Sequence, residues 1–213
     1  MLNKMIEFIA KNYNRVIKMV NRKRLKVDDF SIICNCCIGG VIYNKLGKQF
    51  LSPTINLDIE DVDFYKMVHN LKEYMAEDLV FIESDEKFPV AYCGDVRINF
   101  IHYHSNEEAA QKWYERRERI NYEKLYLIAS DRPYKDHLVT NEMIESLKDI
   151  PCKGRVVFTN RQIPGCDYTF ALPKDADGDY VNIYMLDKTT ILKRWRWETL
   201  FDYVNWLNTG KVK

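Results

Sequence analysis

The sequence predicts a single layered α/β domain whose central sheet is mostly parallel or mixed and is flanked by helices. Two observations predict this class. Short apolar runs, which are typical of buried strands, alternate along the chain with segments whose apolar residues recur at helical spacing. No internal repeat, low-complexity segment or linker rich in Pro and Gly divides the 213 residues. Strands interleaved with helices favour a layered α/β fold, so we expect an N-terminal helix over 1–27 packed on one α/β domain over 28–213.

The first expected element is a basic amphipathic helix over residues 2–24. Its apolar residues recur at helical spacing, and its other face is strongly basic, with Glu7 as the single acid. A helix of this kind usually docks its apolar stripe on the core and leaves its charges in water. It can instead lie on an anionic membrane surface, so peripheral membrane contact through residues 2–24 stays open.

The remaining elements follow from apolar runs, turn residues and helix caps. Gly94 and Asp95 separate two apolar runs and predict a hairpin, and Ser105 with Glu108 forms a capping box that begins a helix. The expected strands are 30–34, 54–57, 79–82, 90–93, 96–103, 125–129, 155–158, 168–172 and 180–185. The expected helices are 41–46, 61–76, 106–120, 140–147 and 198–207, with a loop over 175–179.

The composition excludes several classes of protein. With 46% hydrophobic and 30% charged residues, the chain is neither disordered nor fibrous. Its net charge of +1 gives no argument for nucleic-acid binding. No apolar stretch reaches the ~20 residues that a membrane helix needs, and Lys4, Glu7 and Lys11 interrupt any signal peptide. We therefore expect a cytoplasmic protein with reduced cysteines, no cofactor and no nucleic-acid partner; the oligomeric state is left open.

Ligands of open α/β sheets bind beyond the carboxyl ends of the strands, so the residues that follow each apolar run are candidates for a site. Four expected strands end in groups that can bind or react. These ends are Cys-Asn-Cys-Cys at 34–37, His-Tyr-His-Ser at 102–105, Ser-Asp-Arg at 130–132 and Thr-Asn-Arg at 159–161. Arg132 and Arg161 at neighbouring strand ends would form a clamp for phosphate or carboxylate. The alternative is ordinary helix-cap and turn chemistry in solvated loops.

The cysteine-rich segment "CNCCIGG" at 34–40 allows three interpretations. Zinc typically needs four ligands, and although Cys34 and Cys37 have CxxC spacing, no second pair follows. A thioredoxin-like redox pair is also disfavoured, because Cys34 lies within the expected strand. The third interpretation is that Cys37 is a nucleophile.

The nucleophile interpretation places Cys37 at a strand-to-helix turn, where Gly39 and Gly40 allow close approach of the backbone. Amides at the start of the following helix would stabilise a thiolate and lower the pKa of the thiol. His102 and His104, two residues apart on one face of an expected strand, offer a partner base. The alternative is that Cys37 is a small buried hydrophobic residue and that both histidines are ordinary polar residues near a strand end.

The charged helix expected over 106–120 offers a further candidate. Its spacing puts Trp113, Arg117 and Ile120 on one side. Arg117 then either reaches inward to the strand-end site or belongs to a solvated charged face, which is the usual explanation for such a run.

Four segments carry a resemblance to a known family. They are FSIICNCCIGGVIYNKLG, LSPT, FPVAYCGDVRINFIHYHSNEEAAQKWYERRERIN and LYLIASDR. Together they resemble an uncharacterised bacterial family, domain of unknown function 1919, from about residue 30 to residue 159. Members of this family are often found among genes for exopolysaccharide or capsule synthesis, so the resemblance implies a role around cell-surface glycans.

The family pattern reads roughly Ser-Asn-Asn-Cys-Trp-Gly-Gly where this chain has residues 34–40. Cys34 and Cys36 depart from it, which disfavours zinc and leaves Cys37 as the reactive candidate. The position of His104 is more often lysine, so His102 is the better candidate for a base. The residues at matching positions are Asn35, Cys37, Gly39, Gly40, Asp95, His102, Arg117, Asp131 and Arg132.

A second, looser resemblance is to bacterial proteins described as papain-like cysteine peptidases. These proteins carry an Asn-Cys after a first strand, then a His and an Arg-rich helix. That order is similar to residues 35–37, His102 and residues 116–119. It supports a Cys–His transferase or hydrolase by analogy alone.

The leading hypothesis is a transferase or hydrolase of exopolysaccharide or capsule biosynthesis that acts on an anionic or sugar-bearing substrate. Cys37 would be the nucleophile, His102 the base and Asp131 a second base or an orienting group. The expected substrate-binding residues are Asn35, Gly39, Gly40, His104, Arg117, Arg132 and Arg161, and no metal site is expected.

Two alternatives stay open. One is a non-catalytic binding or recruitment module of the glycan machinery. The other is a sugar-nucleotide transferase without a covalent intermediate, for which Asp175-Ala176-Asp177 has the form of a metal-binding Asp-x-Asp. An Asp-rich loop followed by Gly178 is more typical of a turn.

Overall fold

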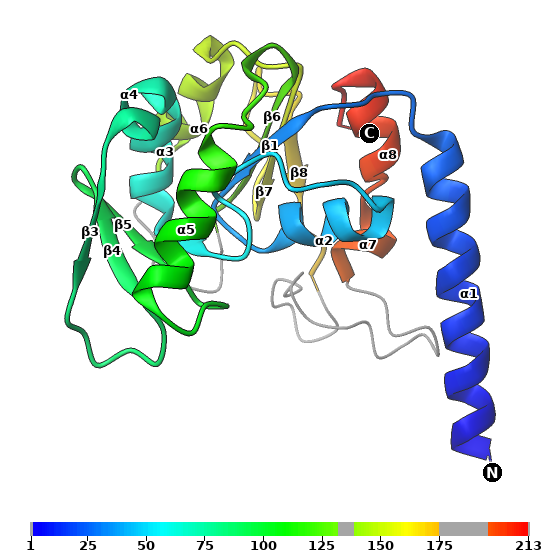
Figure 1. Cartoon of the computed structure of the whole chain (residues 1–213). Coiled ribbons are helices and arrows are strands. Elements are labelled where there is room, and N and C mark those ends of the chain that lie inside the picture. Colours follow the sequence, from blue (N-terminus) through cyan, green and yellow to red (C-terminus); the bar gives the residue numbers. More distant parts are fainter. Residues whose placement is uncertain (1, 132–138, 175–195, 213) are drawn as a thin grey trace.

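The computed structural model describes residues 2–131, 139–174 and 196–212, and Figure 1 shows the whole chain. The expected loop over 175–179, the expected strand over 180–185 and Arg132 lie outside the described residues. The α/β class is confirmed: helices surround a parallel four-stranded sheet, and a second, antiparallel sheet of four strands lies beside it.

The parallel sheet is built from the most apolar runs of the chain. Its strands are β1 (Ser31–Cys34), β6 (Leu125–Ser130), β7 (Gly154–Thr159) and β8 (Thr169–Ala171), in the order β1-β6-β7-β8. All neighbouring pairs are parallel. The carboxyl ends of β1, β6 and β7 therefore meet at one edge of the sheet.

The antiparallel sheet occupies the chain between β1 and β6. Its strands are β2 (Asp58–Ile59), β3 (Leu79–Ile82), β4 (Val90–Cys93) and β5 (Val96–Asn99), in the order β2-β5-β4-β3. The hairpin predicted at Gly94-Asp95 is confirmed, with Gly94 at φ 59° in the turn between β4 and β5. The strand expected over 54–57 is wrong, because this segment forms no backbone ladder; instead the Thr54 side chain accepts a hydrogen bond from Cys34 N of β1.

The helices of the described residues, in chain order, are α1 (Leu2–Arg24), α2 (Ile38–Leu46), α3 (Asp61–His69), α4 (Leu71–Ala76), α5 (Asn106–Arg117), α6 (Asn141–Ser146), α7 (Arg196–Leu200) and α8 (Tyr203–Thr209). Two short 3₁₀ helices cover Tyr122–Lys124 and Leu147–Asp149. The helix start predicted from Ser105 and Glu108 is confirmed, since Ser105 Oγ accepts from Glu108 N. The return bond differs from that of a capping box, because Glu108 Oε2 accepts from His104 N, one residue before the N-cap.

Two helices predicted as continuous are each interrupted. The helix expected over 61–76 stops at Asn70, which has φ −122° and ψ 37°, and restarts as α4. The helix expected over 198–207 is divided into α7 and α8, because the Asp202 side chain caps a new helix by accepting from Asn205 N. Apolar spacing continues through both breaks, so periodicity alone does not reveal them.

Both faces of the parallel sheet are covered, which explains why its strands are almost uniformly apolar. Alternate residues of each strand belong to two separate cores. One core packs β1, β6 and β7 against α2, α7 and α8; the other packs them against α3, α5, α6 and the antiparallel sheet. Figure 1 shows the sheet between these two groups of helices.

The N-terminal helix α1 contacts the rest of the chain near its C-terminal end. Asn21 Nδ2 donates to Tyr203 Oη at 2.9 Å, and Arg24 pairs with Asp202. Figure 1 shows the N-terminal half of α1 reaching past the sheet. No helix among the described residues is long and apolar enough to cross a membrane. The division into a helix over 1–27 and a domain over 28–213 stays a prediction.

Candidate functional site

Three strand ends bring the candidate residues together at the carboxyl edge of the parallel sheet. β1 ends at Cys34, β6 at Ser130 and β7 at Thr159, and these strands are parallel neighbours. The polar residues that follow each strand therefore gather at one edge, as the sequence predicts.

Cys37 occupies the turn between β1 and α2. It is the N-cap residue of α2, with φ −73° and ψ −5°, and its carbonyl accepts the first helical hydrogen bond from Val41 N at 3.2 Å. Its thiol is half-buried. The predicted strand-to-helix turn is thus confirmed, and the amino end of a nine-residue helix lies next to the Cys37 backbone.

His102 reaches Cys37 from the antiparallel sheet. Its Nε2 lies 3.4 Å from Cys37 Sγ, across 65 positions of the sequence. The expected strand over 96–103 is wrong in its second half, because β5 ends at Asn99 and a turn follows in which Tyr103 N donates to Phe100 O. His102 is therefore carried on an exposed turn, and it does not share a strand face with His104.

A buried arginine fixes the turn that carries His102. Arg116 Nη1 donates to Tyr103 Oη at 2.6 Å and to Ile55 O at 3.2 Å, while Tyr103 Oη donates to the same carbonyl at 3.1 Å. The Arg116 guanidinium also stacks over the Phe50 ring at 5.0 Å. This contact ties α5, the His102 turn and the 50–55 loop together.

The spacing of α5 allows Arg117 to point inward, but its buried positions are Ala109, Trp113 and Arg116, and the role of Arg117 as a substrate contact stays a prediction. The three buried positions follow i, i+4, i+7 spacing. Extending the apolar stripe from Ala109 through Trp113 therefore leads to Arg116, a signal that the sequence does contain. Arg117 Nη1 donates to Glu77 O at 3.0 Å, and its guanidinium stacks on Tyr114.

Asn35 holds the base of the site together. It is fully buried. Its Nδ2 donates to Asp61 Oδ1 at 2.8 Å and to Ser130 O at 2.9 Å, and its Oδ1 accepts from Ser130 N at 3.1 Å. These bonds link the end of β1 to the end of β6 and to the start of α3, directly behind the Cys37 turn.

Two buried residues of α3 belong to the same region and were missed from the sequence. Asp61 is 1% exposed and Tyr65, one helical turn later, is 2% exposed. Burial raises the pKa of Tyr65, and the negative charges of Asp131 and Asp61 raise it further. Among the described residues the Tyr65 hydroxyl has no hydrogen-bond partner. Tyr65 fits the apolar spacing of α3, so the sequence does not distinguish its buried hydroxyl from an ordinary core position.

Asp131 and Arg161 form an ion pair at the ends of β6 and β7. Asp131 Oδ2 accepts from Thr159 Oγ1 at 2.6 Å and from Arg161 Nη1 at 2.9 Å. Arg161 also donates to Asn141 Oδ1 and to Val139 O. The sequence predicts an anion clamp from Arg132 and Arg161; the structure shows Arg161 engaged with protein groups, and Arg132 lies outside the described residues.

Gly39 and Gly40 serve the packing of α2. A Cβ on Gly39 would lie 2.7 Å from Cys34 Sγ and 3.0 Å from Ile55 Cδ1, and one on Gly40 would lie 2.6 Å from Asn56 Oδ1. Both glycines are buried. Their lack of a side chain lets the first turn of α2 approach β1 and the 52–57 loop, which places Cys37 at the end of the strand.

The two other cysteines of the cluster are unlike Cys37. Cys34 and Cys36 are both buried, and burial strongly raises the pKa of Cys34, whose Sγ donates to Cys36 O at 3.0 Å. All six cysteines are free thiols. Among the residues that the structure describes, no three His, Cys, Asp or Glu side chains gather to hold a metal ion.

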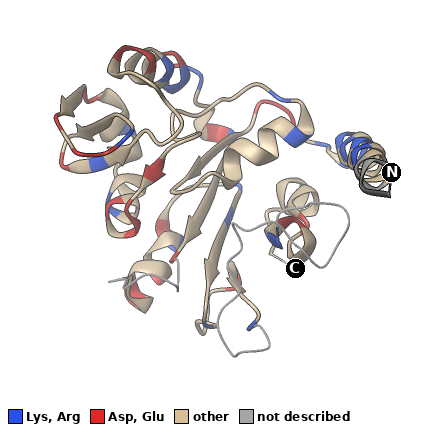
Figure 2. Cartoon of the chain, turned by 90° about the horizontal axis from the view of Figure 1, so that it is seen from below, with Lys and Arg blue, Asp and Glu red and all other residues tan. Residues whose placement is uncertain are grey.

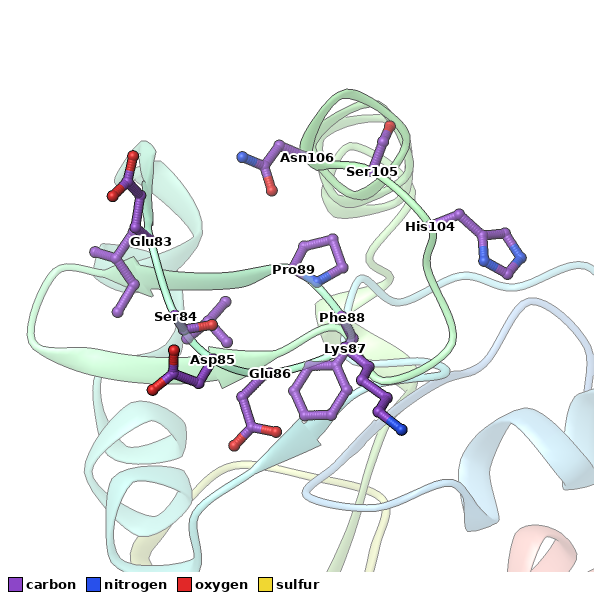
Figure 3. A pocket seen from close by; sticks show the side chains of 12 residues that line it. Glu83, Ser84, Asp85, Glu86, Lys87, Phe88, Pro89, His104, Ser105 and Asn106 are labelled. Carbon is purple, nitrogen blue, oxygen red and sulfur yellow. The ribbon is translucent and has the colours of Figure 1, made fainter.

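His104 lines a different hollow, formed with residues 82–90, Ser105 and Asn106. Figure 3 shows its ring pointing away from the acidic side chains of Glu83, Asp85 and Glu86. Three acids on this rim disfavour an anionic ligand. The role of His104 as a substrate contact stays a prediction.

The site and fold define an α/β protein with a Cys–His pair at the carboxyl ends of its parallel strands. Such a pair can supply a thiolate nucleophile and a proton carrier. Residues 8–208 match the family described as Domain of unknown function (DUF1919), and the chain belongs to this family. It is also similar to an uncharacterized protein of Haemophilus influenzae, with 27% identity over 201 residues that cover 94% of each chain.

Proposed function

We propose that the protein is a cytoplasmic thiol-dependent transferase or hydrolase of cell-surface glycan synthesis, with Cys37 as nucleophile and His102 as proton carrier. The observation that carries the proposal is the 3.4 Å separation of Cys37 Sγ and His102 Nε2. Six free thiols suit a reducing compartment. The glycan role rests on the family resemblance, and the substrate would be anionic or sugar-bearing.

The proposed chemistry has two steps. The Cys37 thiolate attacks an electrophilic carbon, an acyl carbonyl or a sugar anomeric carbon, and forms a C–S bond as the bond to the leaving group breaks. The imidazolium of His102 gives its proton to the leaving group. Water or an acceptor hydroxyl then attacks the same carbon, His102 takes its proton, and the thiolate departs.

Three features support a reactive Cys37. Its thiol is half-buried and therefore reachable, it lies at the amino end of α2, where helix amides favour negative charge, and the Arg116–Tyr103 contact holds the turn of its partner. Asp131 is 3% exposed and paired with Arg161, so we assign it to holding the strand ends rather than to proton transfer.

The test is turnover of a panel of activated substrates, made up of acyl-coenzyme A thioesters, nitrophenyl esters and glycosides, and nucleotide sugars. Cys37→Ala should abolish turnover of any substrate that the native chain accepts. Cys36→Ala is the matched control, because Cys36 is the adjacent thiol and is buried. Equal turnover by both variants would exclude the nucleophile.

Mass spectrometry of the intact chain separates the proposed mechanism from its alternatives. Quenching during turnover should give an adduct on Cys37 that the His102→Gln variant forms more slowly. Turnover of a nucleotide sugar that survives in Cys37→Ala would favour the sugar-nucleotide transferase. Saturable binding of a panel member without turnover by the native chain would favour the non-catalytic binding module.

A further inference from the structure

The described side chains of α1 form three stripes. One is buried, one is basic and contacts the protein through Arg22, whose Nε donates to Lys45 O at 3.3 Å, and one is apolar and exposed. Ala10 and Asn21 are buried, and Asn14 and Ile17 between them are half-buried. These four positions follow the i, i+4, i+7, i+11 spacing of one helix face. This buried stripe is the face that α1 turns to the rest of the chain.

The second stripe is basic. Lys11, Arg15, Lys18 and Arg22 repeat the same spacing one position further along, so they lie beside the buried stripe. Lys23 adds a further positive charge at the end of the helix, where Arg24 is paired with Asp202, and Glu7 is the only acid in residues 2–24. In Figure 2 the ribbon of α1 is largely blue.

The third stripe is apolar and exposed. Among the described residues it contributes seven of the thirteen exposed large hydrophobic side chains. These are Met5 (55% exposed), Phe8 (68%), Ile9 (50%), Tyr13 (44%), Val16 (52%), Met19 (51%) and Val20 (43%). A contiguous apolar stripe of this kind on a folded surface marks an interaction site, whereas singly scattered apolar residues do not.

We propose that this exposed stripe of α1 docks on the surface of an anionic lipid bilayer. An interfacial helix buries its apolar face ~5–10 Å deep, at the boundary of headgroups and acyl chains, while its basic side chains contact anionic headgroups. The basic stripe of α1 borders the apolar stripe, as this arrangement requires. The buried stripe would meanwhile stay packed on the rest of the protein. The inference does not depend on the chemistry of Cys37.

A second copy of the chain fits the same stripe less well. Two α1 helices packed through their apolar stripes would bring two basic stripes together. Helix pairs of this kind usually place acids opposite the bases that flank the seam, and α1 has only Glu7. An anionic bilayer supplies the negative charge that a second copy lacks.

The experiment is co-sedimentation of the full chain with vesicles of phosphatidylcholine alone or mixed with phosphatidylglycerol. We expect binding to the anionic vesicles, weakening as salt rises because the basic stripe is screened. Phe8→Glu with Val16→Glu should lower the partition constant at least about a hundredfold. Val80→Glu is the matched control: Val80 is 62% exposed on β3, and its variant should bind like the native chain.

The basic stripe is tested separately. Replacing Lys11 and Arg15 with Gln should weaken binding to anionic vesicles by about thirtyfold, at ~1 kcal/mol for each charge near the surface. Replacing the exposed Lys148 and Lys153 with Gln changes the net charge equally and should leave binding unchanged. Unchanged thermal melts would show that all variants fold, since each replaced side chain in α1 is exposed.

Three results would overturn the proposal. Absence of vesicle binding by the native chain would do so, as would equal binding by the α1 variants and their controls. The third is a concentration-dependent dimer that Phe8→Glu with Val16→Glu dissociates while vesicles fail to bind, because a second copy would then cover the stripe.

Discussion

The Asn35→Ala variant tests whether Asn35 holds the strand ends together. Asn35 is fully buried, and its side chain bonds to the carboxylate of Asp61 and, through two hydrogen bonds, to the backbone of Ser130. A bond to a charged group contributes about 1.5–3 kcal/mol, and a neutral bond about 0.5–1.5 kcal/mol. We expect the free energy of unfolding to fall by about 3 kcal/mol or more, a large share of the ~5–15 kcal/mol of an ordinary domain.

The assay is urea unfolding followed by far-ultraviolet circular dichroism, analysed by linear extrapolation. Asn44→Ala is the matched control, because Asn44 is exposed on α2 and its side chain can be removed without breaking a buried contact. That variant should unfold within about 0.5 kcal/mol of the native chain.

A loss below about 1 kcal/mol in Asn35→Ala would refute the structural role, because a buried polar network cannot be removed so cheaply. If catalysis failed while stability stayed intact, Asn35 would be a substrate contact, the role predicted from the sequence. If both fell together, the buried network would be the cause.

Three further predictions concern the surroundings of the Cys–His pair. Arg116→Lys should lower the free energy of unfolding by about 1–2 kcal/mol and slow alkylation of Cys37, because a lysine ammonium cannot reproduce the bonds of the planar guanidinium to Tyr103. Equal alkylation rates in the variant and the native chain would show that this contact does not position the His102 turn. Gly39→Ala should lower stability by about 1–3 kcal/mol in urea, since its Cβ would lie 2.7 Å from Cys34 Sγ, and native-like unfolding would contradict this close packing. Iodoacetamide at pH 8 should leave Cys34 unmodified until urea is added, because burial raises its thiol pKa and keeps it protonated through this pH; rapid modification of folded protein at Cys34 would contradict the buried thiol.

The parallel sheet could be predicted from the sequence because its strands are buried on both faces. The apolar runs at β1, β6 and β7 need no partner information to be recognised. Parallel pairing then places the groups that follow each strand at one edge. The approximate location of the candidate site was predictable for this reason.

The errors arise where side chains replace backbone pairing. The segment 54–57 is apolar enough to suggest a strand, yet Thr54 Oγ1 accepts from Cys34 N and its own amide donates to Ser52 Oγ. A side chain that supplies hydrogen bonds in place of a ladder leaves no periodic signal. Asn35 also leaves no periodic signal, because its side-chain amide bonds to Asp61 and Ser130, which lie 26 and 95 positions further along the chain.

The burial of Arg116 rather than Arg117 was not predicted, for a related reason. Both arginines lie on a strongly charged helix, and helical spacing from Trp113 admits either one, at i+3 or i+4. The decision depends on Tyr103 and Ile55, whose positions come from the turn after β5 and the loop before β2. Long-range contacts of this kind are set by the assembled fold.

The proposed function requires Cys37 and His102 to form a thiolate–imidazolium pair. The most direct measurement is the rate of iodoacetamide alkylation of Cys37 from pH 5 to 9, in the native chain and in His102→Gln. If the pair forms, we expect the alkylation rate to inflect well below the ~8.5 of a free thiol in the native chain and to shift toward ~8.5 in the variant. The same inflection near 8.5 in both proteins would contradict the pair.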